Sequence, residues 1–298
     1  MTILPLQLSD YRTSIDLDEL TFVEPDATWD ASVHAIFSEL GASVPENVST
    51  EEALHRLHGL LAPIDPFQLD VRLVEKIERI AAGVNKQQVR TDPLGLPNVS
   101  TKYSGNYPAA DHTCIWVGDI TQLGADVIVN AANSELLGCR LLNHACIDNA
   151  IHSAAGPRLR DDCATIIDRQ QSHEQVGQAK ITRGYALPAR FVLHTVGPQL
   201  RPGSNPTVQE RQQLVNAYRS CLDLASQVEV IRTIAFCAIS TGVFSYPKRE
   251  AAEIALTTVA DWLEAHPQRF DRVIFNLYST ADAWVYEDIL DTYEGRQA

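Results

Sequence analysis

The sequence predicts an α/β fold in which a layered domain with a largely parallel sheet follows a smaller helical extension. Two observations predict it. From Asp111 onward, short β-branched runs alternate with longer amphipathic stretches, as in parallel strands joined by helices. Residues 1–109 instead show helical periods, and they hold 16 acidic against 8 basic residues. We therefore expect residues 1–109 to form a helical N-terminal extension and residues 110–298 to form the α/β domain.

Three helices are expected in the extension. Thr28–Leu40 and Leu69–Ala82 each place apolar residues at helical spacing, and Ser49–Glu52 resembles a capping box before an amphipathic run. Thr91–Pro108 is rich in Pro, Gly, Asn and Ser, which favours a linker or loop.

The α/β domain is expected to contain five strands and four helices. The candidate strands are Cys114–Val117, Val127–Asn130, Phe191–Val196, Thr233–Ala238 and Val273–Leu277. The candidate helices are Cys146–Gln170, Thr207–Gln227, Lys248–Ala265 and Ala281–Glu294. Parallel sheets place ligand sites in the loops beyond the carboxyl ends of their strands, so function is expected in those loops.

Net charge and terminal composition narrow the classes of function. The 298 residues include 24 Lys plus Arg and 38 Asp plus Glu, a formal charge of −14. This balance disfavours nonspecific binding to nucleic acid or to anionic membranes, since both are polyanions. No apolar run approaches the ~20 residues that span a bilayer, and the acidic N-terminus does not resemble a secretory signal. We therefore expect a cytoplasmic protein with no nucleic-acid or membrane partner, whose six cysteines are thiols or metal ligands.

Small polar residues end the second candidate strand. Asn130 and Asn133, separated only by alanines, offer amide donors and acceptors suited to hydroxyls such as those of a sugar. For an isolated Asn-x-x-Asn, however, a capped turn before a helix is the commoner explanation. The upstream run Gly118–Thr121 is equally compatible with a simple turn.

Three candidate metal ligands lie within eight residues. Cys139, His144 and Cys146 stand in a loop that leads into a helix, and zinc accepts two thiolates and an imidazole. With no fourth ligand nearby in the sequence, such a site would be open, and open zinc sites keep a position for water or substrate. Spacing alone also permits another explanation, in which the cysteines are small core residues and the histidine caps the helix.

Asp148 and His152 follow on one helical face. Asp148 interacts favourably with the helix dipole or, beside a metal, orients or deprotonates a water. We interpret His152 as a hydrogen-bonded helix residue rather than as a fourth ligand. The remaining cysteines are interpreted as buried thiols: Cys114, Cys163, Cys221 and Cys237.

A second polar loop, Ser240–Phe244, follows the candidate strand Thr233–Ala238 and precedes a helix. A hydroxyl-rich, glycine-containing turn before a helix N-terminus can cradle an anion, because unpaired N–H groups point outward there. An ordinary strand-to-helix turn is the alternative. The sequence contains neither a P-loop nor a G-x-G-x-x-G pattern, which removes the main support for a Rossmann dehydrogenase.

Taken together and in order, four runs resemble those of a macrodomain, the ADP-ribose-binding three-layer α/β/α module with a mixed central sheet. The runs are Gly118–Thr121; Asn130–Ser134 with Leu136–Gly138; Ile151–Pro157; and Ser240–Phe244 with Tyr246–Pro247 and Ala251–Ala252. The resemblance covers about residues 110–295.

One departure from hydrolase-type macrodomains indicates a subfamily. The run Cys139–Cys146 stands where those proteins carry glycines, and its continuation to His152 resembles the zinc-dependent macrodomains, which also have a helical N-terminal extension. The resemblance implies a protein ADP-ribosyl hydrolase that uses Zn²⁺ and removes mono-ADP-ribose from acidic side chains. Its partners would be ADP-ribose and ADP-ribosylated proteins.

The resemblance also implies the role of each site residue. The zinc ligands would be Cys139, His144 and Cys146, and the catalytic residues Asp148 and Asn133. ADP-ribose would contact Asp119 and Ile120 at the adenine, Asn130 and Asn133 at the distal ribose, and Ser240, Thr241, Gly242, Val243 and Phe244 at the diphosphate. Ser245 stands where many relatives have glycine, so a positive φ at this position would be strained.

We hypothesise that the protein hydrolyses an ester-type bond between ADP-ribose and a protein carboxylate. Zinc would bind or polarise a ribose oxygen or the attacking oxygen, and Asp148 would position water. Two alternatives stay open: an ADP-ribose reader with structural zinc, and an O-acetyl-ADP-ribose deacetylase. Binding without turnover would favour the reader, and preference for the small ester would favour the deacetylase.

Overall fold

A mixed six-stranded sheet forms the centre of the computed structural model, which describes residues 6–19, 22–43, 48–141 and 144–294. The strand order is β1-β6-β5-β2-β4-β3, and neighbours pair in parallel except for β3, which is antiparallel to β4. The strands are β1 (Thr113–Val117), β2 (Val127–Ala131), β3 (Ala179–Arg183), β4 (Phe191–Thr195), β5 (Thr233–Phe236) and β6 (Arg272–Leu277).

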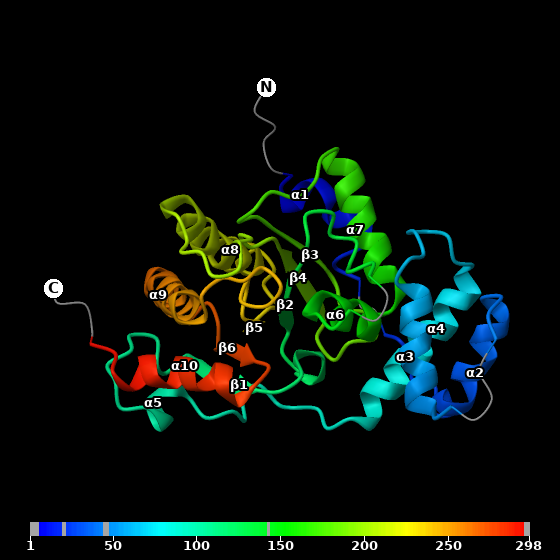
Figure 1. The fold of residues 1–298 in the computed structure, drawn as a ribbon, viewed down its shortest axis with the longest axis horizontal. Helices are drawn as coiled ribbons and strands as arrows, with labels where there is room; N and C mark the ends of the chain where they lie inside the picture. Colours follow the sequence, from blue (N-terminus) through cyan, green and yellow to red (C-terminus); the bar gives the residue numbers. More distant parts are fainter. Residues whose placement is uncertain (1–5, 20–21, 44–47, 142–143, 295–298) are drawn as a thin grey trace.

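Helices cover both faces of the sheet, which confirms the three-layer α/β/α prediction. Figure 1 shows α8, α9 and α10 on one side and α6 and α7 on the other. Their bounds are α6 (Ile147–Ala155), α7 (Pro157–Gln170), α8 (Val208–Ser226), α9 (Lys248–Ala265) and α10 (Thr280–Asp291). In the part of the chain that the structure describes, no helix is long and apolar enough to cross a membrane.

Among the strands and α-helices of the α/β domain, two features differ from the prediction. Strand β3 was not predicted, because its five residues alternate Lys180 and Thr182 with one buried isoleucine and so lack a long apolar run. The single helix expected over Cys146–Gln170 is wrong: α6 ends at Ala155 and α7 begins at Pro157. The break occurs because Gly156 adopts φ +95°, a conformation open to glycine, and a proline then suits the first position of a new helix.

Three helices of the N-terminal part pack around their own small core. They are α2 (Trp29–Glu39), α3 (Thr50–Leu61) and α4 (Val71–Gln87). The core includes Val33, Ile36, Phe37, Leu57 and Ile77. Half of the expected capping box is present: Ser49 Oγ accepts a hydrogen bond from the Glu52 N–H at 3.2 Å, but among the described residues the Glu52 side chain makes no return bond to the Ser49 N–H.

Other N-terminal residues join the main core instead. The short helices α1 (Leu8–Tyr11) and η1 (Arg12–Ile15) pack against α7, and Tyr11 is buried. The Tyr11 hydroxyl accepts a hydrogen bond from the Ile181 N–H at 3.0 Å, so it covers an edge group of β3 that would otherwise lack a partner. The segment 91–108, expected to be a linker or loop, is partly helical: α5 (Val99–Lys102) packs on β1, and Tyr107 is buried in the main core.

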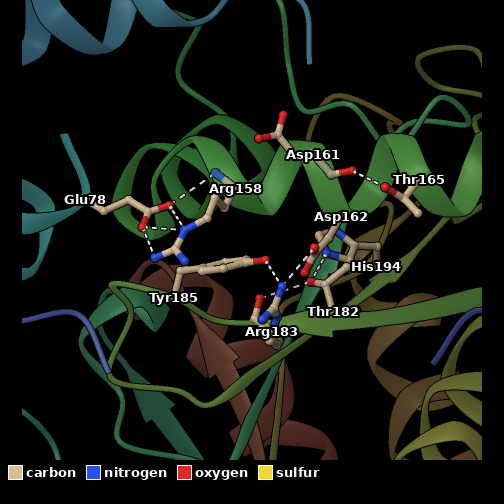
Figure 2. Close-up of polar contacts among 9 residues, drawn as sticks. All are labelled: Glu78, Arg158, Asp161, Asp162, Thr165, Thr182, Arg183, Tyr185 and His194. Carbon is tan, nitrogen blue, oxygen red and sulfur yellow. Dashed lines mark hydrogen bonds and ion pairs between the residues drawn. The ribbon is translucent and has the colours of Figure 1, made fainter. Parts of the chain in front are cut away.

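The three-helix group is joined to the α/β domain by a buried carboxylate on α4. Glu78 is fully buried, and Arg158 of α7 donates to it through Nε at 2.8 Å and through Nη2. Figure 2 shows this pair above the ring of Tyr185, over which the Arg158 guanidinium lies at 4.7 Å from the centroid. A Cβ on Gly156 would approach Glu78 Cγ to 2.5 Å, so the glycine at the α6–α7 break also makes room for this contact.

A second buried carboxylate in the same region predicts a pH-dependent stability. Burial raises the pKa of Asp162 to about 6, although Tyr185 and Arg183 oppose the shift. The folded state therefore binds the proton of the Asp162 carboxyl group more tightly than the unfolded state does. The stability that Asp162 contributes is greatest below about pH 4 and is lost as the pH rises through about 6. We expect the free energy of unfolding of Asp162→Asn, relative to wild type, to rise by up to about 3 kcal/mol between pH 4 and pH 7 in urea titrations.

Asp168→Asn, on the exposed face of the same helix, is the matched control and should show no such change. If the wild-type and Asp162→Asn stability curves run parallel across this pH range, the assignment to Asp162 is contradicted.

Candidate active site

The sheet topology brings the predicted polar loops to one edge. Strands β1, β6, β5 and β2 are consecutive and parallel, so the loops that follow them leave the sheet in the same direction. Asp119 follows β1, Asn133 follows β2 and Ser240 follows β5. The candidate ligand-binding residues, far apart in sequence, therefore lie on the carboxyl-terminal side of the sheet.

Asp148 is held by both asparagines of the β2 loop. The amide nitrogen of Asn130 donates to Asp148 Oδ1 at 2.7 Å, and that of Asn133 lies 3.5 Å from Oδ2 and donates to the Gly138 carbonyl at 3.0 Å. Burial raises the pKa of Asp148 to about 6, and the bond from Asn130 opposes this shift. The loop thus orients a buried carboxylate and limits its contact with solvent.

The three candidate zinc ligands converge in the structure. Their donor atoms lie within 4.8 Å of one another, with Cys139 Sγ 3.3 Å from His144 Nδ1. Tetrahedral zinc with bonds of about 2.0–2.3 Å separates its ligand atoms by about 3.5–3.8 Å, so this donor set fits zinc after small movements. Asn149 braces the loop, because its amide nitrogen donates to the His144 carbonyl at 3.0 Å. Leu142 and Asn143, within the same run, lie outside the described residues.

All six cysteines are free, and the four interpreted as buried thiols are confirmed as buried. Cys139 and Cys146 differ from them in being only partly buried. The two candidate ligands are therefore the thiols that a solvent-borne ion can reach.

The loop Ser240–Phe244 presents free backbone donors. Among the described residues, no hydrogen bond is donated by the N–H groups of Gly242, Val243 or Phe244. Helix α9 begins only at Lys248, so these groups belong to the loop itself rather than to the first turn of the helix. Ser240 and Ser245 have φ of 65° and 56°, and Tyr246 N–H closes the loop on the Ser240 carbonyl at 3.0 Å.

The positive φ of Ser245 predicts a stabilising substitution. A residue with a side chain is strained in this left-handed region, whereas glycine adopts it freely. Ser245→Gly should raise the free energy of unfolding by up to about 1 kcal/mol, measured by urea denaturation. Ser245→Ala keeps a Cβ and should give no gain; an equal gain in both variants would contradict strain as the cause.

Asp119 and Ile120 stand at the start of the short helix η2 (Ile120–Gln122). Asp119 Oδ1 accepts from the Thr121 N–H at 2.9 Å and from the Thr121 hydroxyl at 2.8 Å, which fixes the carboxylate and leaves Oδ2 for another donor. The Ile120 side chain is buried in the main core. A ligand beside Asp119 can therefore meet Ile120 only through its backbone.

A cavity of about 320 Å³ lies between this part of the site and the N-terminal helices. Its lining includes Asp119, His144 and Cys146 from the α/β domain, and His55 and His58 from α3. The helical extension therefore forms one wall of a space that also contains two candidate zinc ligands. Asn130, Asn133 and the loop 240–244 do not line this cavity.

Sequence reasoning missed a buried polar group behind Asp148. The interpretation of His152 as a hydrogen-bonded helix residue is wrong, because neither ring nitrogen has a hydrogen-bond partner among the described residues and Nε2 lies 3.6 Å from Asp148 Oδ1. His194 of β4 and Cys163 of α7 complete this enclosed group. The signal in the sequence was a histidine within the mainly apolar run Phe191–Val196.

Comparison with known proteins is consistent with this arrangement. The Macro domain family profile matches residues 129–255. A variant of the Oceanobacillus iheyensis macrodomain, solved with ADPR, is 40% identical with a TM-score of 0.53, covering 60% of this chain and 92% of that one. The chain belongs to the macrodomain family.

Two further relatives of this macrodomain protein are informative. The Trypanosoma brucei macrodomain in complex with ADP-ribose is 28% identical with a TM-score of 0.57, and covers 91% of this chain and 99% of that one. A protein-ADP-ribose hydrolase of Staphylococcus aureus is 50% identical over 179 residues, 60% of this chain. The chain spans 66% of the length of that relative, slightly less than two thirds.

Proposed function

We propose that this macrodomain protein is a zinc-dependent hydrolase that removes mono-ADP-ribose from acidic side chains of proteins. The observation that carries the proposal is a buried carboxylate, Asp148, held by two asparagines and placed two residues after a candidate zinc ligand. The likeness to proteins named protein-ADP-ribose hydrolase supports the reaction class.

Different residues of the chain would bind the nucleotide, contact the ribose and transfer the proton. Asp119 and the free N–H groups of residues 242–244 bind and orient the nucleotide, since a carboxylate accepts from an adenine amino group and free N–H groups bind phosphate oxygens. Asn130 offers its buried carbonyl oxygen, which has no partner within the described part of the chain, to a ribose hydroxyl. Asp148 orients the attacking water and accepts its proton as the ester bond to the acceptor is cleaved.

Cys139, His144 and Cys146 would hold the zinc ion. When bound there, zinc would supply Lewis-acid polarisation of a substrate or water oxygen. These three residues would leave a coordination position open, and the distances between their donor atoms support their holding a zinc ion.

The test is hydrolysis of an aspartate-linked ADP-ribosylated protein before and after zinc removal. We expect a chelator to lower the rate at least about tenfold and added zinc to restore it, with metal content measured on the same samples. Cys139→Ser should lose zinc and activity together, whereas Cys221→Ser, a buried thiol outside the site, should keep both. An unchanged rate after verified zinc loss would reject the catalytic use of the metal.

Two further measurements on the same protein, ADP-ribose binding and turnover of O-acetyl-ADP-ribose, separate the two alternatives. Tight ADP-ribose binding with no release from any acceptor would identify a reader with structural zinc. Faster turnover of O-acetyl-ADP-ribose than of the modified protein would identify a deacetylase.

A further inference from the structure

Asn130, which donates a hydrogen bond to Asp148, is the first member of a series of buried hydrogen bonds that has no role in the proposed reaction. His194 is paired with Asn130 in the register of β2 and β4, and both side chains are fully buried. His194 Nδ1 lies 3.2 Å from the amide nitrogen of Asn130, and Nε2 lies 3.0 Å from the hydroxyl of Thr182 on β3. Figure 2 shows the contact between His194 and Thr182.

The donors and acceptors in this series of hydrogen bonds are compatible with a single arrangement. Asn130 donates one N–H to Asp148, because a carboxylate oxygen only accepts, and its second N–H then points to His194. His194 Nδ1 must therefore accept, so the ring is neutral and carries its proton on Nε2. That N–H donates to Thr182 Oγ1, whose own hydrogen is donated to the Arg183 carbonyl at 3.2 Å.

We propose that His194, as the Nε2–H tautomer, is a positioning residue that fixes the Asn130 amide, directing its N–H toward Asp148 and its carbonyl oxygen toward the ligand. This inference rests on the proposed function for its catalytic consequence, but its structural part concerns ADP-ribose binding alone. Asn130 Oδ1 has no partner among the described residues although it is buried, as expected of an acceptor that waits for a ligand hydroxyl.

A second metal site is the competing explanation of this group. Donor atoms of His152, Cys163 and His194 lie within 4.8 Å of one another. Both nitrogens of His194 are already hydrogen-bonded, however, so no lone pair of this ring faces Cys163 Sγ, which lies 3.6 Å from Nε2. The group therefore fits a fixed tautomer better than a ligand set.

Two substitutions separate the two ring nitrogens. His194→Asn can place an oxygen acceptor near the position of Nδ1, whereas His194→Gln reaches only toward the position of Nε2. We expect His194→Gln to weaken ADP-ribose binding about five- to tenfold, because a buried N–H of Asn130 loses its acceptor. His194→Asn should keep an affinity for ADP-ribose within about twofold of wild type. Cys163→Ala should do the same, because Cys163 contacts the His194 ring but is not part of the hydrogen-bond series.

A double-mutant cycle tests whether His194 acts through Asn130. In the background of Asn130→Ala, His194→Gln should weaken ADP-ribose binding no further, beyond about twofold. Additive losses, or equal losses in the Asn and Gln variants, would overturn the proposal, since a residue with a merely structural role would show them.

A readout independent of binding and turnover is the tautomer. In ¹⁵N-histidine-labelled full-length protein, long-range ¹H–¹⁵N spectra should show the ring that disappears in His194→Gln to be protonated on Nε2 only. A proton on Nδ1, or loss of the free ring signals on adding zinc beyond one equivalent, would overturn the assignment. Thr182→Val keeps the ring and should still weaken ADP-ribose binding at least about threefold, so the test does not depend on the folding of one variant.

Failure of the proposed function is distinguishable from failure of this inference. Binding without turnover by the wild-type protein would reject hydrolysis and leave the cycle and the tautomer assignment standing. Turnover by the wild-type protein together with additive losses in the double-mutant cycle would support hydrolysis and reject the proposed role of His194.

Discussion

Asp148→Asn is expected to lower kcat for release of ADP-ribose from an aspartate-linked protein by about 10²–10⁴-fold, the usual contribution of a general base. Asparagine keeps the shape of the side chain, and its oxygen can still accept from the Asn130 amide, which donates to Asp148 at 2.7 Å. It lacks the charge needed to accept a proton from water. Binding of free ADP-ribose should therefore change by less than about threefold, because the amide preserves the packing of the loop.

The measurement is single-turnover kinetics with zinc-loaded protein, paired with calorimetric titration of ADP-ribose. Asp168→Asn, on the exposed face of α7, is the matched control for removing one negative charge. Full activity of Asp148→Asn at normal zinc content would exclude Asp148 as the base and would move the proton-accepting role to another group.

Lys180→Met should reduce the free energy of unfolding by about 3–5 kcal/mol, the cost of leaving a buried charge without its partner. Lys180 Nζ lies 2.5 Å from Glu174 Oε2, and the side chains of Lys180 and Glu174 are 2% and 1% exposed. The loss should reach the site as well, because the Glu174 N–H donates to the Ser134 carbonyl at 2.8 Å and so ties this segment to the loop of Asn133.

A surface pair of the same length provides the control. Lys248 and Asp282 also approach to 2.5 Å, but Lys248 is 55% exposed, so Lys248→Met should cost less than about 1 kcal/mol. The double variant Lys180→Met with Glu174→Gln removes both charges and should regain most of the lost stability. Urea denaturation of the three variants decides the matter, and equal losses for Lys180→Met and Lys248→Met would contradict the role of burial.

Much of the fold could be predicted because its signals are local. Strands β2, β5 and β6 are buried on both faces, so each has a mainly apolar sequence. Such a run can be recognised without knowing which strands lie beside it. Helices α3 and α8 carry their start signals at Ser49 and Thr207. Strand β3 and the α6–α7 break were missed because an alternating five-residue strand and a glycine-proline pair inside a helical period are weak signals by themselves.

The candidate site follows the same division. Cys139, His144 and Cys146 lie within eight residues, so their spacing alone restricts the loop enough to indicate a shared ligand. The loops of Asp119, Asn130 and Ser240 were each weak in isolation and gained meaning from their order along the chain.

What the sequence by itself determined is the succession of strands and helices and the short-range metal-ligand set, because both depend on residues a few positions apart. Only the tertiary structure decided which distant groups meet: His194 beside Asn130, Lys180 against Glu174, and helix α3 across a cavity from Cys146. The physical reason is that such contacts depend on strand register and helix docking, which are set by the packing of the whole core and leave no periodic trace in the chain.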